Sequence, residues 1–355
     1  MTWNWQRPDW PDFRWDRDLL RKTEEEFLIG SGVVVGTLRH LTGEDLDLLT
    51  VEVVSAEALT TSEIEGEILD RASVQSSIRR QFGLDADKRR VPPAEAGIAE
   101  MMMDLYRSYA AELSDKMLWN WHRHLMKGRT DLQDVGRYRT SDDPMQVVSG
   151  APYRAKVHFE APPSGAVRKE MKRFVKWFNR TEPTGPEPLP AVTRAGIAHL
   201  YLESIHPFED GNGRVGRAVS EKALAQGVGQ PSLTALAQTI LVRRKDYYSA
   251  LEAANKSNDV TAWLAWFAGV AIEAQRRTVA RAQFLIDKTR LLDRLKGEIN
   301  ERQEKVLLRM LREGPDGFKG GLSAGNYAKI TGASPATTTP CTNRSTSNWP
   351  RSPPC

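Results

Sequence analysis

The stretch "VTRAGIAHLYLESIHPFEDGNGRVGRAVSEKALAQ", residues 192–226, predicts two helices joined by a short turn. The first helical pattern ends just before Pro207, because a proline ring cannot continue a helix. A new helical pattern begins near Gly213, so "PFEDGNG" forms the connection. Gly211 and Gly213 allow backbone conformations that residues with a Cβ atom resist. The stretch therefore predicts a tight turn whose backbone N–H groups point outward at the start of the second helix.

The side chains of this turn predict a phosphate site. Backbone N–H groups at a helix N-terminus attract phosphate, and a polyphosphate is the natural ligand. Arg214 and Arg217 lie three residues apart on roughly one helix face, where both could contact further phosphate oxygens. Asp210 offers the kind of carboxylate that binds Mg²⁺ beside phosphates. His206 is a titratable base that could take a proton from an attacking hydroxyl.

Simpler interpretations exist for each residue alone. A histidine at a helix end is commonly a cap or a packed ring, arginines in a first turn are commonly solvated, and one Gly-Asn-Gly is an ordinary turn. A metallohydrolase is a second alternative, with His199, His206 and Asp210 as metal ligands. That alternative leaves the two arginines and the glycine-rich turn without a role.

Composition narrows the classes of protein. The chain has 355 residues, 40% hydrophobic and 27% charged, as expected of a soluble globular protein with more than one domain. Its net charge of +4 is too small to indicate a dedicated nucleic-acid or membrane surface. The cysteines, Cys341 and Cys355, come at the very end, so no disulfide framework or Cys-based zinc site organises the main body. No apolar run reaches the roughly 18 residues of a transmembrane helix. We expect a cytoplasmic protein.

The pattern along the chain predicts a mainly helical fold. Helical patterns cover 94–112, 114–127, 164–180, 192–205, 213–227, 232–255 and 259–300. One segment, "MQVVSGAPYRAKVHFEAPP" at 145–163, instead predicts a β-hairpin. We expect a helical N-terminal domain at 1–85, a linker and helix at 86–112, a second body at 113–270, which the family resemblance given below implies is the catalytic core, a connecting helix at 271–300, a partial winged-helix module at 301–339 and a disordered tail at 340–355.

The two ends of the chain have unusual compositions. Four tryptophans, Trp3, Trp5, Trp10 and Trp15, fall among the first fifteen residues, and aromatic clusters of this kind usually serve packing.

The other end resembles the start of a winged helix, with helix, turn and helix before a second short helix near Ser334. From Pro340 onward four prolines and no apolar periodicity interrupt it, which favours a truncated or frame-shifted tail and argues against DNA binding.

The twelve-residue segment "HPFEDGNGRVGR", residues 206–217, matches the signature of the Fic family at each specified position. That signature is His-Pro-Phe, any residue, Asp or Glu, Gly-Asn-Gly-Arg, any two residues, Arg. The segments "GRYRTSDDPMQVVSG" and "KVHFEAPP" resemble the family's flap hairpin, and "VRRKDYYSALEAA" resembles the helix after the signature. The region before residue 85 is similar to the domain that often precedes Fic cores. The chain is thus identified as a member of the Fic family.

This resemblance implies a reaction. Fic proteins are mostly helical enzymes that transfer AMP from ATP to a hydroxyl side chain of a target protein and release pyrophosphate. It implies that His206 deprotonates the target Ser, Thr or Tyr, and that Asp210 binds Mg²⁺ between the α- and β-phosphates. Phe208 is expected to anchor the loop in the core, and Glu209 fills a free position of the signature.

The remaining signature residues are implied to hold the nucleotide. Gly211, Asn212 and Gly213 would form an anion hole, with Asn212 donating to the α-phosphate. Arg214 and Arg217 would hold the outer phosphates, Arg217 chiefly the γ-phosphate.

Two further contacts follow from the resemblance. The flap edge Met145, Gln146, Val147, Val148 and Ser149 could pair with an extended target segment by β-augmentation, or it could be an ordinary surface hairpin. Tyr247 and Tyr248 could touch adenine, although aromatic residues on a helix are more often core.

Upstream, "TTSEIEGEIL" at 60–69 resembles the family's inhibitory motif, here Thr61, Glu65 and Gly66. A spacing of four puts Thr61 and Glu65 on one helix face. The resemblance assigns Glu65 a salt bridge to Arg217 that blocks productive ATP binding, as in family members with an N-terminal inhibitory helix. A glycine inside a helix costs about 1 kcal/mol relative to alanine, so Gly66 predicts that another group comes close. Glu63 and Glu67 are expected to be solvent-exposed.

The favoured function is a protein adenylyltransferase that uses ATP and Mg²⁺ and acts on target proteins, including itself. Removal of AMP, or transfer of another phosphate-containing group, stays open on the same site, since Glu65 could orient a water. A DNA-binding regulator that senses nucleotide is the non-enzymatic alternative, and a homodimer is also left open.

Overall fold

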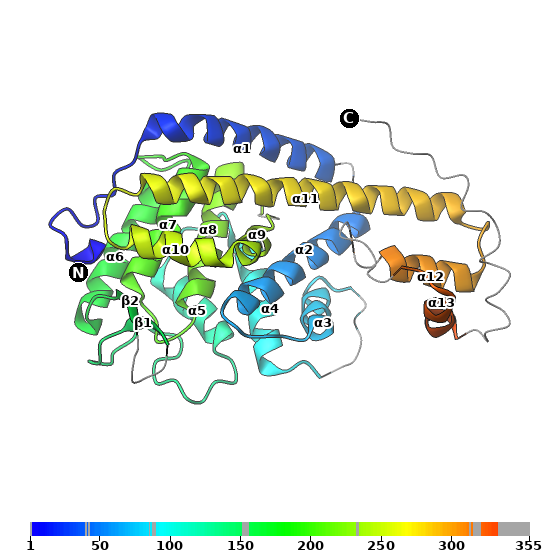
Figure 1. Ribbon diagram of the computed structural model, residues 1–355, viewed down its shortest axis with the longest axis horizontal. Coiled ribbons are helices and arrows are strands. Elements are labelled where there is room, and N and C mark those ends of the chain that lie inside the picture. The colour runs from blue at the N-terminus through cyan, green and yellow to red at the C-terminus, as the bar shows by residue number, and fades with distance from the viewer. Residues whose placement is uncertain are drawn as a thin grey trace. The chain divides into compact units, whose positions relative to one another are not determined.

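A computed structural model describes residues 2–39, 41, 43–84, 86, 90–150, 156–231, 234–311, 314 and 321–332. The chain is mainly helical, as its pattern predicts, and it divides into two compact units, Met1–Val279 and Ala280–Cys355. The first unit contains the signature loop, and the long helix α11 covers Thr261–Leu295 (Figure 1). The helices before it are η1 (Asn4–Gln6), α1 (Arg17–Leu38), α2 (Gly43–Ile64), α3 (Arg71–Gln81), α4 (Pro93–Ser108), α5 (Asp115–Leu125), α6 (Ser164–Arg180), α7 (Ala191–Ile205), α8 (Asn212–Val228), α9 (Leu236–Val242) and α10 (Arg244–Ala254).

Helices α7 and α8 form the centre of the first unit. Every residue of α7 is buried. This burial agrees with its sequence, which has almost no polar face. Two glycines let neighbours approach closely: a Cβ atom on Gly216 would lie 2.8 Å from Glu203 Oε1, and one on Gly196 would lie 2.7 Å from Leu264 Cδ2. Trp263 of α11 also donates from its indole nitrogen to the Gly196 carbonyl over 2.8 Å. The signature loop therefore connects two tightly packed helices.

Carboxylates of the N-terminal helices stabilise the start of two core helices. Glu24 of α1 accepts hydrogen bonds from the backbone N–H groups of Val192 (3.1 Å) and Thr193 (2.6 Å), at the start of α7. Glu57 of α2 accepts one from Ala237 over 2.7 Å, at the start of α9. Neither α7 nor α9 has a side-chain cap of its own, so these long-range carboxylates satisfy N–H groups that would otherwise lack partners.

The predicted hairpin is present. Strands β1 (Gln146–Ser149) and β2 (Lys156–Glu160) pair antiparallel, with a bulge between Val147 and Val148. The hairpin tip, 151–155, lies outside the described residues.

The predicted packing role of the N-terminal tryptophans is confirmed for three of them. Trp3 packs edge-on against Phe159 of β2 at 5.4 Å between ring centroids, and Trp5 donates to the Glu160 carbonyl over 2.7 Å. Trp10 packs edge-on against Tyr201 of α7 at 5.1 Å.

The prediction of one helix over 232–255 is wrong, because α9 and α10 are separate. The backbone leaves the helical region at Arg243, where φ is −109° and ψ is 29°. Glu57 holds the first N–H groups of α9, and this long-range bond places the start of that helix at Leu236. A local pattern cannot show such a bond.

The second unit contains α12 (Glu301–Leu311) and α13 (Ala324–Thr331), which contact each other. The predicted third helix near Ser334 and the predicted disordered tail at 340–355 fall outside the described residues. In the described part of the chain, no helix is both long and apolar enough to cross a membrane.

Candidate active site

The signature loop begins with a strained residue. His206 ends α7 with φ 51° and ψ 61°, which makes it the one non-glycine residue with a positive φ among those described. Arg139 holds this turn from outside, since its backbone N–H donates to the Pro207 carbonyl (2.9 Å) and its Nε donates to the His206 carbonyl (2.8 Å). Arg139 is buried, and no sequence pattern linked it to the loop, because it reaches the loop from a distant segment. Strain at a residue proposed to act as a base is typical of functional sites.

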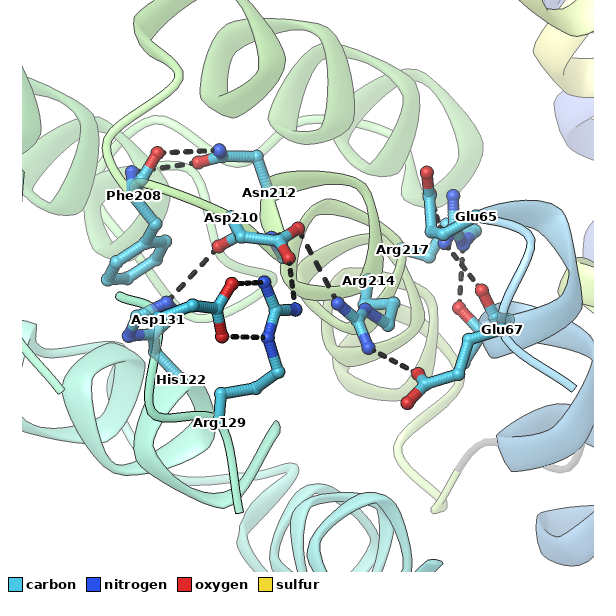
Figure 2. A network of polar contacts seen from close by, with 12 residues as sticks. Glu65, Glu67, His122, Arg129, Asp131, Phe208, Asp210, Asn212, Arg214 and Arg217 are labelled. Atoms are coloured by element: carbon cyan, nitrogen blue, oxygen red, sulfur yellow. Dashed lines mark hydrogen bonds and ion pairs between the residues drawn. The ribbon is translucent and has the colours of Figure 1, made fainter. Parts of the chain in front are cut away.

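Asn212 closes the loop on itself. Its side-chain oxygen accepts from the Phe208 N–H over 2.9 Å, and its side-chain nitrogen donates to the Phe208 carbonyl over 2.8 Å (Figure 2). The side-chain amide of Asn212 is therefore engaged within the loop, and its donation to a phosphate stays a prediction. Phe208 is fully buried, which confirms the predicted anchoring role.

His122 of α5 packs against the signature loop, and this role was not predicted from the sequence. Its ring stacks on Phe208 at 4.2 Å between centroids. Nδ1 accepts from the Gly136 N–H over 2.9 Å, so Nε2 carries the proton and donates to the Asp210 carbonyl at 3.1 Å. Burial lowers the pKa of His122 to about 4, which keeps the ring neutral. His122 thus adopts the tautomer whose N–H group donates to the backbone of the signature loop.

The first turn of α8 carries the predicted anion site. Gly211 has φ 80°, a value that favours glycine, and the helix starts at Asn212 with no side-chain cap. A carboxylate already stands there, because a Cβ atom on Gly213 would lie 2.2 Å from Glu65 Oε1. The helix N-terminus therefore faces a negative group supplied by the chain itself.

Arg217 is held by the segment that resembles the inhibitory motif. Its Nε donates to Thr61 Oγ1 (2.7 Å), and its Nη2 donates to the Thr61 carbonyl (2.9 Å) and to Glu65 Oε1 (2.7 Å). Arg217 is only 2% exposed. The salt bridge that the resemblance implies between Glu65 and Arg217 is present in the structure.

The expectation for Gly66 is wrong in its reason. Helix α2 ends at Ile64, so Gly66 lies beyond the helix, and a Cβ atom there would meet nothing within 4 Å. Its φ of 86° is what favours glycine.

The expectation that Glu67 is simply solvated is also wrong. The turn at Gly66 brings Glu67 Oε2 to 2.7 Å from Arg214 Nη1. Glu63, one turn earlier in the helix, is exposed as expected. Both signature arginines are thus paired with glutamates from one short segment.

Asp210 contacts an arginine that the sequence did not suggest. Arg129 follows α5 and donates from Nη1 to Asp210 Oδ2 over 2.7 Å, while its other edge forms two 2.7 Å bonds with Asp131. Burial alone would raise the pKa of Asp210, but Arg129 and Arg214 more than offset it and hold the pKa below its usual value. The carboxylate of Asp210 is therefore ionised.

The chemistry of Asp210 fits the implied magnesium ion. Among the described residues no group of three or more His, Cys, Asp or Glu side chains could hold a metal. One ionised carboxylate beside a phosphate site suits Mg²⁺, which keeps waters and uses phosphate oxygens as further ligands.

Two neutral buried groups lie beside each other at the end of α7. His206 Nδ1 is 3.7 Å from Glu203 Oε2, and Glu203 Oε1 has no hydrogen-bond partner among the residues that the structure describes. Burial lowers the pKa of His206 to about 4 and raises the pKa of Glu203 to about 8. At neutral pH His206 is therefore unprotonated and ready to accept a proton, and Glu203 carries its proton.

The raised pKa of Glu203 predicts a pH-dependent stability. Between the ordinary glutamate pKa of 4.5 and about 8 the unfolded state releases this proton and the folded state keeps it, so the free energy of unfolding falls as pH rises through that range. Glu203→Gln should remove this loss. We expect the variant and the wild type to be similar at acidic pH, with the variant gaining on the order of 1 kcal/mol per pH unit above it. Urea unfolding at several pH values measures this, and parallel pH curves would contradict it.

The other predicted residues have structural partners. Tyr247 is buried and its hydroxyl lies 2.9 Å from His199 Nε2, so both belong to the core. With His199 engaged by Tyr247 and Asp210 by Arg129, the alternative of a His199–His206–Asp210 metal site gains no support. Tyr248 is 41% exposed and donates to the Ile64 carbonyl over 3.2 Å, at the end of the helix that leads to Glu65.

The flap is tied to α10. Ser149 Oγ lies 2.6 Å from His158 Nε2, and His158 Nδ1 lies 2.7 Å from Glu252 Oε2. All four residues of β1 are exposed, and in the described chain this strand pairs only with β2. Its other edge is therefore available for an added strand.

The fold and the site together define a mainly helical protein with one central loop, between α7 and α8, of the kind predicted to bind phosphate. Residues 112–224 match the model of the Fic/DOC family, so this part of the chain is a Fic/DOC domain. Residues 3–84 match a domain of unknown function, DUF4172.

Two curated relatives are similar to part of the chain. The chain is 31% identical over 144 residues to the protein adenylyltransferase fic-1 of Caenorhabditis elegans, covering 41% of this chain and 24% of that protein. It is 27% identical over 198 residues to the protein adenylyltransferase Fic of Drosophila ananassae, covering 55% and 36%. The matches thus span about a quarter to a third of these relatives.

The fold is similar to a Fic family protein from Desulfovibrio desulfuricans G20, with a TM-score of 0.53, 21% identity and coverage of 92% of this chain and 94% of that chain. It is also similar to Fic-1 from Caenorhabditis elegans, with a TM-score of 0.53, 22% identity and coverage of 74% and 73%.

Proposed function

We propose that the chain is a protein adenylyltransferase that transfers AMP from ATP to hydroxyl groups of target proteins and of itself, and that Glu65 holds it inactive. The observation that carries this proposal is the position of the Glu65 carboxylate, over Gly213 and 2.7 Å from Arg217. A site that pairs a helix N-terminus with a buried arginine is built for an anion. The names of the curated relatives supply the reaction.

The residues of the loop suit this chemistry. His206 takes the proton of the acceptor hydroxyl, since burial keeps its ring neutral. The hydroxyl oxygen then bonds to the α-phosphorus, the bond from that phosphorus to the bridging oxygen breaks, and pyrophosphate leaves. The backbone N–H groups at the start of α8 stabilise the charge on the α-phosphate. Mg²⁺ bound at Asp210 would add positive charge beside the phosphates.

The flap offers a place for the acceptor segment. Within the described residues strand β1 has a free edge, and Val147 and Val148 on this strand are exposed. An extended target segment could add to this edge through main-chain hydrogen bonds. We propose that residues 145–149 dock the target in this way. Tyr248, near the end of α2, is proposed to border the adenine.

Glu65 is proposed to act as a brake. While it binds Arg217, that arginine cannot hold the outer phosphates of ATP, and the carboxylate repels them. Thr61 takes two of the hydrogen bonds of Arg217 and so keeps the guanidinium in the inhibited position.

Two differently labelled forms of ATP test the reaction. Purified Glu65→Gly protein with Mg²⁺ should become labelled from ATP carrying radioactivity on the α-phosphate and should stay unlabelled from ATP carrying it on the γ-phosphate. Intact mass should rise by one AMP. Label from the γ-phosphate would instead indicate phosphate transfer, and absence of both labels on the chain and on lysate proteins would overturn the proposal. Loss of AMP from premodified chain on incubation without ATP would favour the removal reaction.

A further inference from the structure

The loop has more internal ion pairs than the inhibitory motif explains. Each charge proposed to bind ligand is already neutralised by a residue of the chain. The pairs are Arg217 with Glu65, Arg214 with Glu67 and Asp210 with Arg129 (Figure 2). Two of these partners, Glu67 and Arg129, lie outside both the signature and the inhibitory motif.

Glu67 neutralises the second arginine. The side chain of Arg214 is only 6% exposed, and its remaining contact with a carboxylate is the longer 3.6 Å approach to Asp210. Glu67 reaches it at 2.7 Å because the backbone reverses at Gly66, just after Glu65. A carboxylate hydrogen-bonded to a largely buried guanidinium is a strong interaction, and it occupies the donor that a phosphate oxygen would use.

Arg129 neutralises the carboxylate. Asp131 fixes the guanidinium with two 2.7 Å bonds, which leaves Nη1 directed at Asp210 Oδ2. A bidentate partner restricts the orientation of the guanidinium, so Arg129 presents a single, positioned positive charge. That charge lies where the carboxylate would bind a divalent cation.

We infer that Glu67 and Arg129 are specificity determinants. The Glu67 carboxylate takes the place of a phosphate group at Arg214, and the Arg129 guanidinium takes the place of a divalent cation at Asp210. This inference rests on the proposed function. A ligand must bring negative and positive charge together to replace both, and a nucleotide triphosphate with its Mg²⁺ does so. Three guanidiniums face four carboxylates in this network, so the free site is net negative and disfavours a metal-free polyphosphate.

The consequence for Glu67 is a change in anion affinity. Glu67→Gln removes the negative charge and keeps the shape of the side chain. We expect ATP without metal, and inorganic pyrophosphate, to bind about tenfold more tightly, as loss of one charge-assisted competitor implies. The difference in affinity between ATP with Mg²⁺ and ATP without it should narrow. Glu63→Gln, an exposed glutamate of the same segment, is the matched control and should bind like the wild type.

The consequence for Arg129 is a change in metal affinity. Arg129→Gln leaves Asp210 without its positive partner, so Mn²⁺ alone should bind about tenfold more tightly. Arg168→Gln, an exposed arginine of α6, is the control. Calorimetry on the full chain measures the anions, and the loss of the free Mn²⁺ signal in electron paramagnetic resonance measures the metal. Both readouts are independent of catalysis.

The outcomes separate this inference from the proposed function. If the variants bind like their controls while Glu65→Gly transfers AMP, the inference is overturned and the function stands. If Glu65→Gly binds no ATP, both are overturned. Tighter anion binding by Glu67→Gln together with tighter Mn²⁺ binding by Arg129→Gln supports the inference, and circular dichroism of each variant checks that it is folded.

Discussion

Replacing Glu65 with glycine is expected to raise the rate of AMP transfer at least tenfold, both to target proteins and to the chain itself. The substitution removes a charge-assisted hydrogen bond to a buried arginine, which contributes about 1.5–3 kcal/mol. Loss of this competing interaction corresponds to a roughly 10–100-fold higher affinity for a ligand that binds the same arginine. It also clears the space over Gly213, where the carboxylate now lies. Glycine is suitable because position 65 lies just beyond the last residue of α2.

The measurement is incorporation of α-labelled AMP into the purified chain and into a lysate over time. Glu63→Gly is the matched control, since Glu63 is exposed in the same segment. The control should keep the low wild-type rate. Equal rates for the wild type and Glu65→Gly would show that Glu65 does not restrain the enzyme.

Replacing His206 with alanine is expected to reduce AMP transfer by about 10²–10⁴-fold, the usual contribution of a positioned general base. The effect should be measured in the Glu65→Gly background, where the starting rate is high. His206 is the one neutral base of the loop, and the clamp of Arg139 on its carbonyl fixes its place. Because the phosphate-binding groups remain, the affinity for ATP should change little.

The control is His124→Ala, which removes a histidine of α5 whose ring contacts Glu100 of α4 and Asn120 of α5. It should transfer AMP at the rate of its parent. Full label on the His206→Ala protein would exclude His206 as the base, whereas unchanged ATP binding with lost transfer would place its role in the chemical step.

Much of the local structure follows from the sequence. The helices at 164–180 and on both sides of the signature loop are predicted nearly to the residue, since their apolar spacing and their Pro and Gly boundaries are local signals. The hairpin is predicted for the same reason. The break between α9 and α10 is missed, because the backbone leaves the helical region at Arg243, a position that no proline or glycine marks in the sequence.

The site shows the same division. His206, Asp210 and the two signature arginines could be chosen from their spacing and chemistry. His122 and Arg129 could not, because each reaches the loop from a segment with no motif of its own, and Arg139 lies in the segment that resembles the flap but has no pattern that links it to the loop. A signal existed for His122 alone: it lies on the buried face of α5 with Leu118, Trp121 and Leu125, where a polar ring requires partners.

The sequence by itself determined the helical pattern, the loop between α7 and α8, and the chemical character of that loop, because these depend on residues within a few turns of one another. Only the tertiary structure decided which charges meet. The sequence predicts a solvated Glu67, but in the structure the positive φ of Gly66 directs Glu67 toward Arg214. Likewise Arg129 has no relation to Asp210 along the chain. Ion pairs act through space over a few ångströms, so the pairing that closes this site depends on the packing of α2, α5 and α8 and not on any local pattern.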